Sequence, residues 1–165
     1  MKEDTRINPQ DYSYAFRFSR YDCFKVRTGI CSLHLTNEQY QKIKEREKNK
    51  DFKAGSVDYC RLFASHMIKE DWFKKNTLID ADHYKCGHVA LASGQHRTCI
   101  AKTIKRDSLT LNTFKYNDGI CRVCSFKKGE GQKTTLQKLI NTYKKRKRKK
   151  FANHNFIDDE GIYYY

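Results

Sequence analysis

The chain has 165 residues, a length that favours one domain over two and that can bury a core without disulfide bonds. Its 34 Lys and Arg outnumber its 19 Asp and Glu, which gives a net charge of +15. Solubility needs a net charge of only about 2–8, so this excess indicates a polyanionic partner, nucleic acid first and an anionic membrane surface second. The sequence lacks an apolar stretch of the roughly 18 residues that a membrane span needs and lacks a signal-peptide pattern. We therefore expect a cytoplasmic protein.

Aromatic side chains compensate for a modest hydrophobic content. Hydrophobic residues make up 38% of the chain, but 11 Tyr and 10 Phe supply large apolar surfaces for a core. The chain is therefore expected to fold, although 32% of its residues are charged. Its seven cysteines, an odd number without an export signal, favour free thiols or metal ligands over a disulfide framework.

The N-terminal part of the chain has short strand-like segments. Aromatic residues stand at alternate positions from Tyr12 to Phe18, which predicts a half-buried strand. Residues 24–26 and 31–35 have the composition of further strand pieces, separated by a turn at Gly29. We expect these pieces to join one small sheet.

Two helices are predicted next. Thr36 and Gln39 have the spacing of a capping box, so a polar surface helix should begin there and run to about residue 50. Apolar residues recur at helical spacing over 57–75, which predicts a helix that packs on the core.

Strands and helices alternate in the second half of the chain. In chain order the segments are a connection (76–85), a strand (88–92), a helix (98–106), a strand (109–114) and, after a linker, a last helix (135–150). Asn117-Asp118-Gly119 is a hairpin signal, which predicts that residues 120–126 return as the antiparallel partner of the strand before them.

The stretch from Val89 to Lys102 carries the clearest functional signal. A short strand runs into Gly94, then into the polar residues Gln95, His96 and Arg97, and then into a helix. Glycine permits a tight turn and the close approach of a ligand, and a helix N-terminus attracts anions. An arginine there can contact a phosphate with two hydrogen bonds. A purely structural turn is the alternative interpretation, because Gly and Arg are common in turns.

Ser-Gly-Gln-His-Arg at 93–97, followed by Cys-Ile-Ala-Lys at 99–102, resembles the Gly-x-His-Arg signature of the ParB/sulfiredoxin-like superfamily. The order of predicted elements over about 55–115 is similar to the core of that superfamily. The resemblance implies an α+β fold with a small mixed sheet. We expect one ParB-like domain over 1–130, and a basic C-terminal helix and tail over 131–165.

The resemblance also implies a ligand and a set of contacts. The loop would hold the phosphates of a nucleotide such as CTP or ATP, with contacts from Ser93, Gly94, Gln95, His96, Arg97 and Thr98. For a nuclease, His96 would be the general base and Arg97 would stabilise charge on the phosphate. The sequence departs from the superfamily in two ways, which limit the functions that the resemblance implies. No helix-turn-helix follows residue 115, and Gln95 replaces the catalytic cysteine of sulfiredoxin. Sulfiredoxin's reductase chemistry is therefore not expected.

A second candidate site is built from cysteine and histidine. Zinc takes four nitrogen or sulfur ligands in a tetrahedron, and His83, Cys86, Cys121 and Cys124 would supply them if the two segments are neighbours. Cys86 also stands two residues before His88. Against zinc, residues 121 and 124 fall in a predicted strand, where they would point to opposite faces. Ordinary buried thiols are therefore the alternative.

Seven consecutive cations end the last predicted helix: Lys144, Lys145, Arg146, Lys147, Arg148, Lys149 and Lys150. They favour nucleic-acid binding through phosphates, with a solvated end or a localisation signal as the alternative. The sequence thus predicts a nucleic-acid-associated ParB-like protein, with DNA binding, regulation or nuclease activity. A nucleotide-dependent enzyme of the phosphotransferase type and a zinc-stabilised interaction protein without enzymatic activity are the alternatives.

Overall fold

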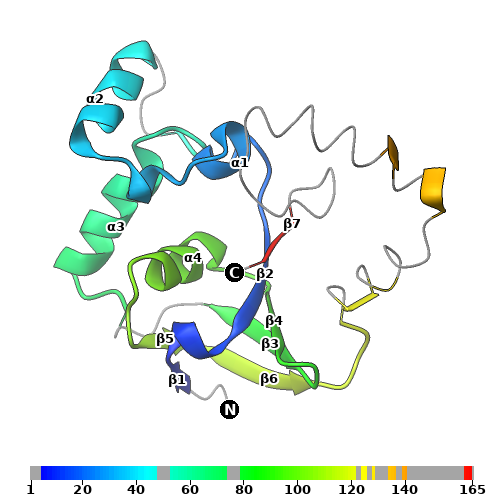
Figure 1. Ribbon diagram of the computed structural model, residues 1–165. Helices are drawn as coiled ribbons and strands as arrows, with labels where there is room; N and C mark the ends of the chain where they lie inside the picture. The colour runs from blue at the N-terminus through cyan, green and yellow to red at the C-terminus, as the bar shows by residue number, and fades with distance from the viewer. Residues whose placement is uncertain are drawn as a thin grey trace.

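Figure 1 shows a computed structural model of the chain, which describes residues 5–47, 53–73, 79–121, 124–125, 128, 134–136, 139–140 and 162–164. Helices and a mixed sheet form a small α+β fold, as the sequence predicts. None of the helices in this part of the chain is long and apolar enough to cross a bilayer.

A five-stranded mixed sheet forms the centre of the molecule. Its strands are, in spatial order, β6 (Thr113–Asn117), β3 (Asp80–Tyr84), β4 (His88–Leu91), β2 (Ser13–Arg17) and β7 (Ile162–Tyr164). The pairs β3–β4 and β2–β7 are antiparallel, whereas β2–β4 and β3–β6 are parallel. A separate antiparallel pair joins β1 (Thr5–Ile7) to β5 (Leu109–Leu111).

Strand β2 is amphipathic in the way its alternating aromatic residues predict. Tyr14 and Phe16 are fully buried, and Phe18 continues their row just past the end of the strand. The rings of Tyr14 and Phe16 stack with their centres 5.5 Å apart, and those of Phe16 and Phe18 with centres 5.7 Å apart. Ser13 and Arg17 point to the other face and are exposed. One face of β2 thus forms the core.

Helices cover that face in successive layers (Figure 1). Helix α4 (Gln95–Thr103) lies against the sheet, and α3 (Tyr59–Lys69) packs on α4. Helix α2 (Asn37–Arg46) lies outermost and has no fully buried residue, as its polar sequence predicts. The core-facing residues of α3 and α4 are Ala64, Met67, Thr98, Ile100 and Ala101.

Both segments predicted as minor strand pieces are helical. Residues 24–26 lie in α1 (Phe24–Thr28), and residues 31–35 contain the 3₁₀ helix η2 (Ser32–His34). A second 3₁₀ helix, η1 (Pro9–Asp11), precedes β2. Local hydrogen bonds decide the outcome: Gly29, with φ 90°, donates its N–H to the carbonyl of Lys25 at 2.7 Å and closes α1.

The hairpin predicted at Asn117-Asp118-Gly119 is wrong. Strand β6 does not pair with residues 118–121 or 124–125, the described residues that follow it most closely, but lies parallel to β3, with Tyr84 opposite Asn117. Strand β3 occupies a segment that the sequence predicts to be a connection. The prediction missed the strand because its sequence, Asp-Ala-Asp-His-Tyr, lacks the apolar alternation that marks a half-buried strand. The partner of β6 therefore comes from a segment 30 or so residues earlier.

The capping box of α2 makes a measurable prediction. The hydroxyl of Thr36 accepts from the N–H of Gln39 at 3.2 Å, and the side-chain oxygen of Gln39 accepts from the N–H of Thr36 at 3.0 Å. Thr36→Ala should therefore lower the free energy of unfolding by about 1 kcal/mol. Urea denaturation measures this, with Thr36→Ser as the variant that retains the cap. An unchanged midpoint for Thr36→Ala would contradict the role of the cap.

Candidate metal centre and anion-binding loop

The parallel pairing of β3 and β6 brings two cysteine-bearing segments together. Because Tyr84 lies opposite Asn117, the chain leaves both strands at the same end of the sheet. The next residue of each segment takes part in a salt bridge, in which Nζ of Lys85 lies 2.8 Å from Oδ1 of Asp118. The residues that follow on each side are therefore neighbours.

A tight turn between β3 and β4 presents the first two candidate ligands. Gly87 has a φ of 82°, a conformation that favours glycine, and its N–H donates to the carbonyl of Tyr84 at 2.8 Å. Cys86, just before it, is exposed, and His88, just after it, begins β4. The sequence Cys-Gly-His thus turns two ligand side chains toward the segment after β6.

Cys121 and Cys124 are spaced by one helical turn. The N–H of Ser125 donates to the carbonyl of Cys121 at 2.9 Å, which is the hydrogen bond of an α-helical turn. Residues three apart share a face of such a turn. The expectation that residues 120–126 form a strand, with these two thiols on opposite faces, is therefore wrong.

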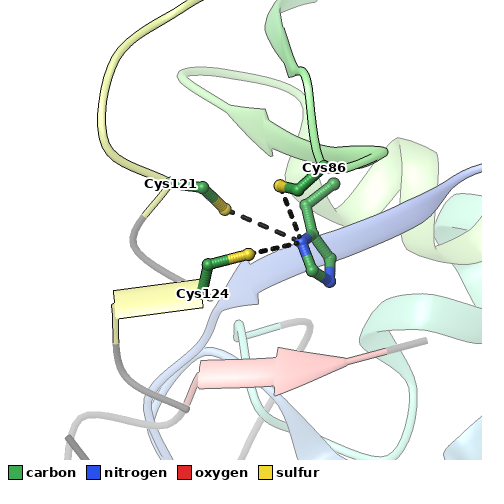
Figure 2. Close-up of side chains that lie close together, drawn as sticks. Cys86, Cys121 and Cys124 are labelled. Carbon is green, nitrogen blue, oxygen red and sulfur yellow. Dashed lines mark hydrogen bonds between the residues drawn. The ribbon is translucent and has the colours of Figure 1, made fainter. Parts of the chain in front are cut away.

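Three sulfur atoms surround one imidazole ring in Figure 2. Nδ1 of His88 lies 3.1 Å from Sγ of Cys86, 3.5 Å from Sγ of Cys124 and 3.7 Å from Sγ of Cys121. All four atoms lie within 4.8 Å of one another. With Zn–S bonds of about 2.3 Å and Zn–N bonds of about 2.0–2.1 Å, a tetrahedral ion separates its sulfur and nitrogen ligands by about 3.6 Å. The cluster therefore has the dimensions to hold a metal ion such as zinc.

Hydrogen bonds within the cluster couple the ionisation of its thiols. Desolvation acts to raise the pKa of Cys86, but hydrogen bonds from the backbone and ring of His88 and from the other two thiols lower it to about 6. The pKa of Cys124 is raised to about 11, first by its hydrogen bond to Cys86 and then by desolvation and the nearby Cys121. Between Cys86 and Cys124 one thiolate is thus favoured over two, and a divalent cation is the partner that lets both ionise.

Three of the four predicted metal ligands belong to this cluster, and His88 takes the place expected for His83. The antiparallel register puts His83 opposite Val89, so His83 and His88 point to opposite faces of the sheet. The ring of His83 instead contacts the rings of Tyr12 and Tyr116. The Cys-x-His spacing at 86–88 was the sequence signal for the correct histidine.

The Ser93–Arg97 loop lies at the other end of β4, a four-residue strand that spans about 13 Å. Gly94 is the N-cap of α4 and has a φ of 66°. A Cβ atom at this position would lie 2.4 Å from Cγ1 of Ile79. Packing against Ile79 therefore requires glycine here independently of any ligand.

Most polar groups of the loop bind the protein's own backbone. The hydroxyl of Ser93 accepts from the N–H of Asp80 at 3.1 Å, and the side-chain oxygen of Gln95 accepts from the N–H of Arg17 at 2.6 Å. Thr98 is fully buried, and its hydroxyl donates to the carbonyl of Gly94 at 3.2 Å. These contacts fix the loop on the sheet, and the predicted phosphate contacts of these side chains stay predictions.

His96 is half-buried and packs against the protein's own backbone and aromatic rings. Its Nε2 lies 3.0 Å from the carbonyl oxygen of Asp22 and, because a carbonyl only accepts, carries the proton. Its ring centre lies 4.4 Å from that of Phe18 and 5.1 Å from that of Tyr59. Desolvation lowers the pKa of His96, and the hydrogen bond to Asp22 offsets part of this lowering. The ring is therefore neutral at pH 7. The structure thus accounts for His96 as a packed residue, and its role as a general base stays a prediction.

The charge of Arg97 is less well accommodated. Its Cζ lies 5.6 Å from the centre of the Trp72 ring. Its Nε and Nη1 are buried and have no hydrogen-bond partner among the described residues. Burial lowers the pKa of Arg97, yet a guanidinium stays charged in proteins. Buried charged donors without acceptors cost free energy, and an anion at the start of α4 would relieve that cost.

Comparison with models of known protein families, with curated proteins and with solved structures finds no match to this chain. The ParB-like resemblance, the nucleotide and the nucleic-acid partner therefore stay predictions. The basic run Lys144–Lys150 lies outside the described residues, as does most of the helix predicted over 135–150.

Metal binding should depend on His88 and not on His83. His88→Ala removes one ligand of the cluster, so it should bind zinc more weakly than the wild type, and His83→Ala should bind as the wild type does. Zinc content after dialysis and the visible spectrum of cobalt-substituted protein measure both variants. Equal loss in the two variants would contradict the assignment of His88.

The burial of His96 predicts a pH effect on stability. Because its pKa is lower in the folded than in the unfolded state, the unfolded chain binds more protons as the pH falls below about 6.5. The stability contributed by neutral His96 is therefore present above that pH and is lost below it, by at most about 1.4 kcal/mol per pH unit. Urea denaturation from pH 7 to pH 5 should show a steeper loss for the wild type than for His96→Gln. Parallel curves would refute the effect.

Proposed function

We propose that this protein is a ParB-like domain that binds a phosphate-bearing ligand, a nucleotide or a nucleic-acid backbone, at the first turn of α4. The observation that carries the proposal is Arg97, whose Nε and Nη1 are buried without a partner among the described residues. A guanidinium in this state calls for an anionic acceptor, and arginine, which stays charged, binds phosphate oxygens with charge-assisted hydrogen bonds.

The position of Arg97 in the fold supports the same ligand. It stands in the first turn of a nine-residue helix, where backbone N–H groups and the positive end of the helix dipole favour an anion. Gly94 begins that helix without a side chain, and no side chain caps it. Without an anion, a cation at this end of a helix is unfavourable.

Charge supports nucleic acid as the larger partner. The chain carries +15, and a polyanion is the partner that such a field attracts at long range. Salt distinguishes the two predicted contacts, the contact of many cations with a nucleic-acid backbone and the contact of Arg97 with a phosphate. Binding through many lysines and arginines weakens steeply with salt, because counterions are released, whereas a buried arginine is screened much less.

Binding is better supported than any particular reaction. A nuclease that used His96 as a general base would have to act through Nδ1, because Nε2 donates to Asp22. The ring is also half-buried and contacts the rings of Phe18 and Tyr59. We therefore propose ligand binding as the function and leave nuclease and phosphotransferase activity as the predictions made from the sequence.

The proposal includes a structural zinc ion. Cys86, His88, Cys121 and Cys124 make a complete tetrahedral set of protein ligands, which is typical of structural and not of catalytic sites. When bound, zinc would tie the turn between β3 and β4 to the segment after β6. Its binding free energy would then add to the stability of the fold.

The loop proposal is tested by thermal stability against nucleoside di- and triphosphates. A ligand at 100 times its dissociation constant should stabilise the wild type by about 2.7 kcal/mol. Arg97→Ala should lose this gain, and Arg97→Lys should keep only part of it, because lysine keeps the charge without the fork. Unchanged zinc content shows that the variants are folded. A gain of equal size in Arg97→Ala, or none in the wild type, would refute nucleotide binding at this loop.

A further inference from the structure

Three aromatic rings form a row at the end of the sheet that carries the metal centre. The rings of Tyr12 and His83 meet edge to face with centres 5.3 Å apart, and those of His83 and Tyr116 do so with centres 5.8 Å apart. They come from the start of β2, from β3 and from β6, so the row crosses the sheet. We call Tyr12, His83 and Tyr116 the aromatic row.

Strand register explains why the row is continuous. His83 lies directly opposite Tyr116 in the parallel pair β3–β6, so the two side chains share a face. Ser13 lies opposite His88, so Tyr12, just before β2, lies beside Gly87, just before β4. Gly87 places no side chain between the rings of Tyr12 and His83. The same Cys-Gly-His turn thus serves the metal centre and leaves room for the row.

The row leads from the core to the surface. Tyr14, the next inward-facing residue of β2, is fully buried, and its ring centre lies 6.5 Å from that of Tyr12. Tyr12 and His83 are half-buried, whereas Tyr116 is 61% exposed. A large aromatic side chain held at the end of a packed row, with most of its surface in water, offers a rigid flat face to a ligand.

Charge and ring chemistry identify the partner. Lys115 lies on the opposite face of β6 from Tyr116, and Lys85 pairs with Asp118, so the attraction for a polyanion comes from the whole chain, with its net charge of +15. Exposed aromatic faces on basic proteins bind unpaired bases by stacking while cations meet the phosphates. Bases within a duplex are already stacked on one another and cannot use such a face.

We propose that the aromatic row binds bases of single-stranded nucleic acid, with Tyr116 as the stacking residue. The inference rests on the proposed nucleic-acid partner but not on the loop at Arg97, which lies at the opposite end of β4. The two sites are therefore separable by mutation.

The test measures binding of the zinc-loaded full chain to a fluorescent oligonucleotide of about ten nucleotides, as a single strand and as a duplex. Tyr116→Ala should weaken single-strand binding about 5- to 100-fold and leave duplex binding unchanged. Tyr116→Phe, which keeps the ring, should bind as the wild type does. Tyr21→Ala removes an equally exposed tyrosine beyond the other end of β2 and should have no effect on single-strand binding.

Because stacking is not ionic, the loss in Tyr116→Ala should keep its size as salt is raised. Wild-type affinity in Tyr116→Ala, an equal loss in Tyr21→Ala, or a change in the oligomeric state of Tyr116→Ala by sedimentation would each overturn the inference. If the wild type binds no nucleic acid at all, the nucleic-acid partner fails as well. The nucleotide test at Arg97 remains independent of that result.

Discussion

Much of this molecule depends on the parallel pairing of β3 with β6. A parallel partner cannot follow through a short turn, so the chain between these strands has to cross back over the sheet. In this protein it does so through β4, α4 and β5. The pairing sets the ends of β3 and β6 side by side and so brings together the candidate metal ligands His88 and Cys121, which are 33 positions apart. Because β4 runs the opposite way, it carries the chain to the Ser93–Arg97 loop at the far end.

Periodic sequence patterns predicted the elements that are half buried. The alternating aromatic residues of β2, the apolar face of α3 and the capping box of α2 all correspond to elements of the structure. In β2 the alternation expresses directly which side of the strand meets the core, and in α2 the capping box marks where the helix begins. The α+β class follows from the same patterns.

Pairing between distant strands could not be predicted in this way. Strand β3 has one small apolar residue, Ala81, in its first three positions, so its extended form depends on its two neighbours in the sheet. Asn117-Asp118-Gly119 does end a strand, but a turn signal does not say which strand comes next to it. The metal site shows the same limit. The spacing of its cysteines was informative, yet the choice between His83 and His88 required the register.

The Ser93–Arg97 loop shows that a short signature can have a structural reason. Gly94 is required by the side chain of Ile79, and Gln95 and His96 hold the ends of β2 and of the segment after it. A sequence pattern cannot separate these structural contacts from ligand contacts, because both select the same residues. Arg97 differs from its neighbours, since its two buried donors have no hydrogen-bond partner among the described residues.

Strand β7 has a consequence for the order in which the fold forms. It pairs with β2, so residues 162–164 at the end of the chain complete a sheet that residues 13–17 began. Contacts between such distant segments form slowly, because a long loop must close first. Until β7 arrives, β2 presents one row of backbone N–H and C=O groups to any other strand in solution. Edge-to-edge association is therefore most favoured in the interval before β7 docks on β2.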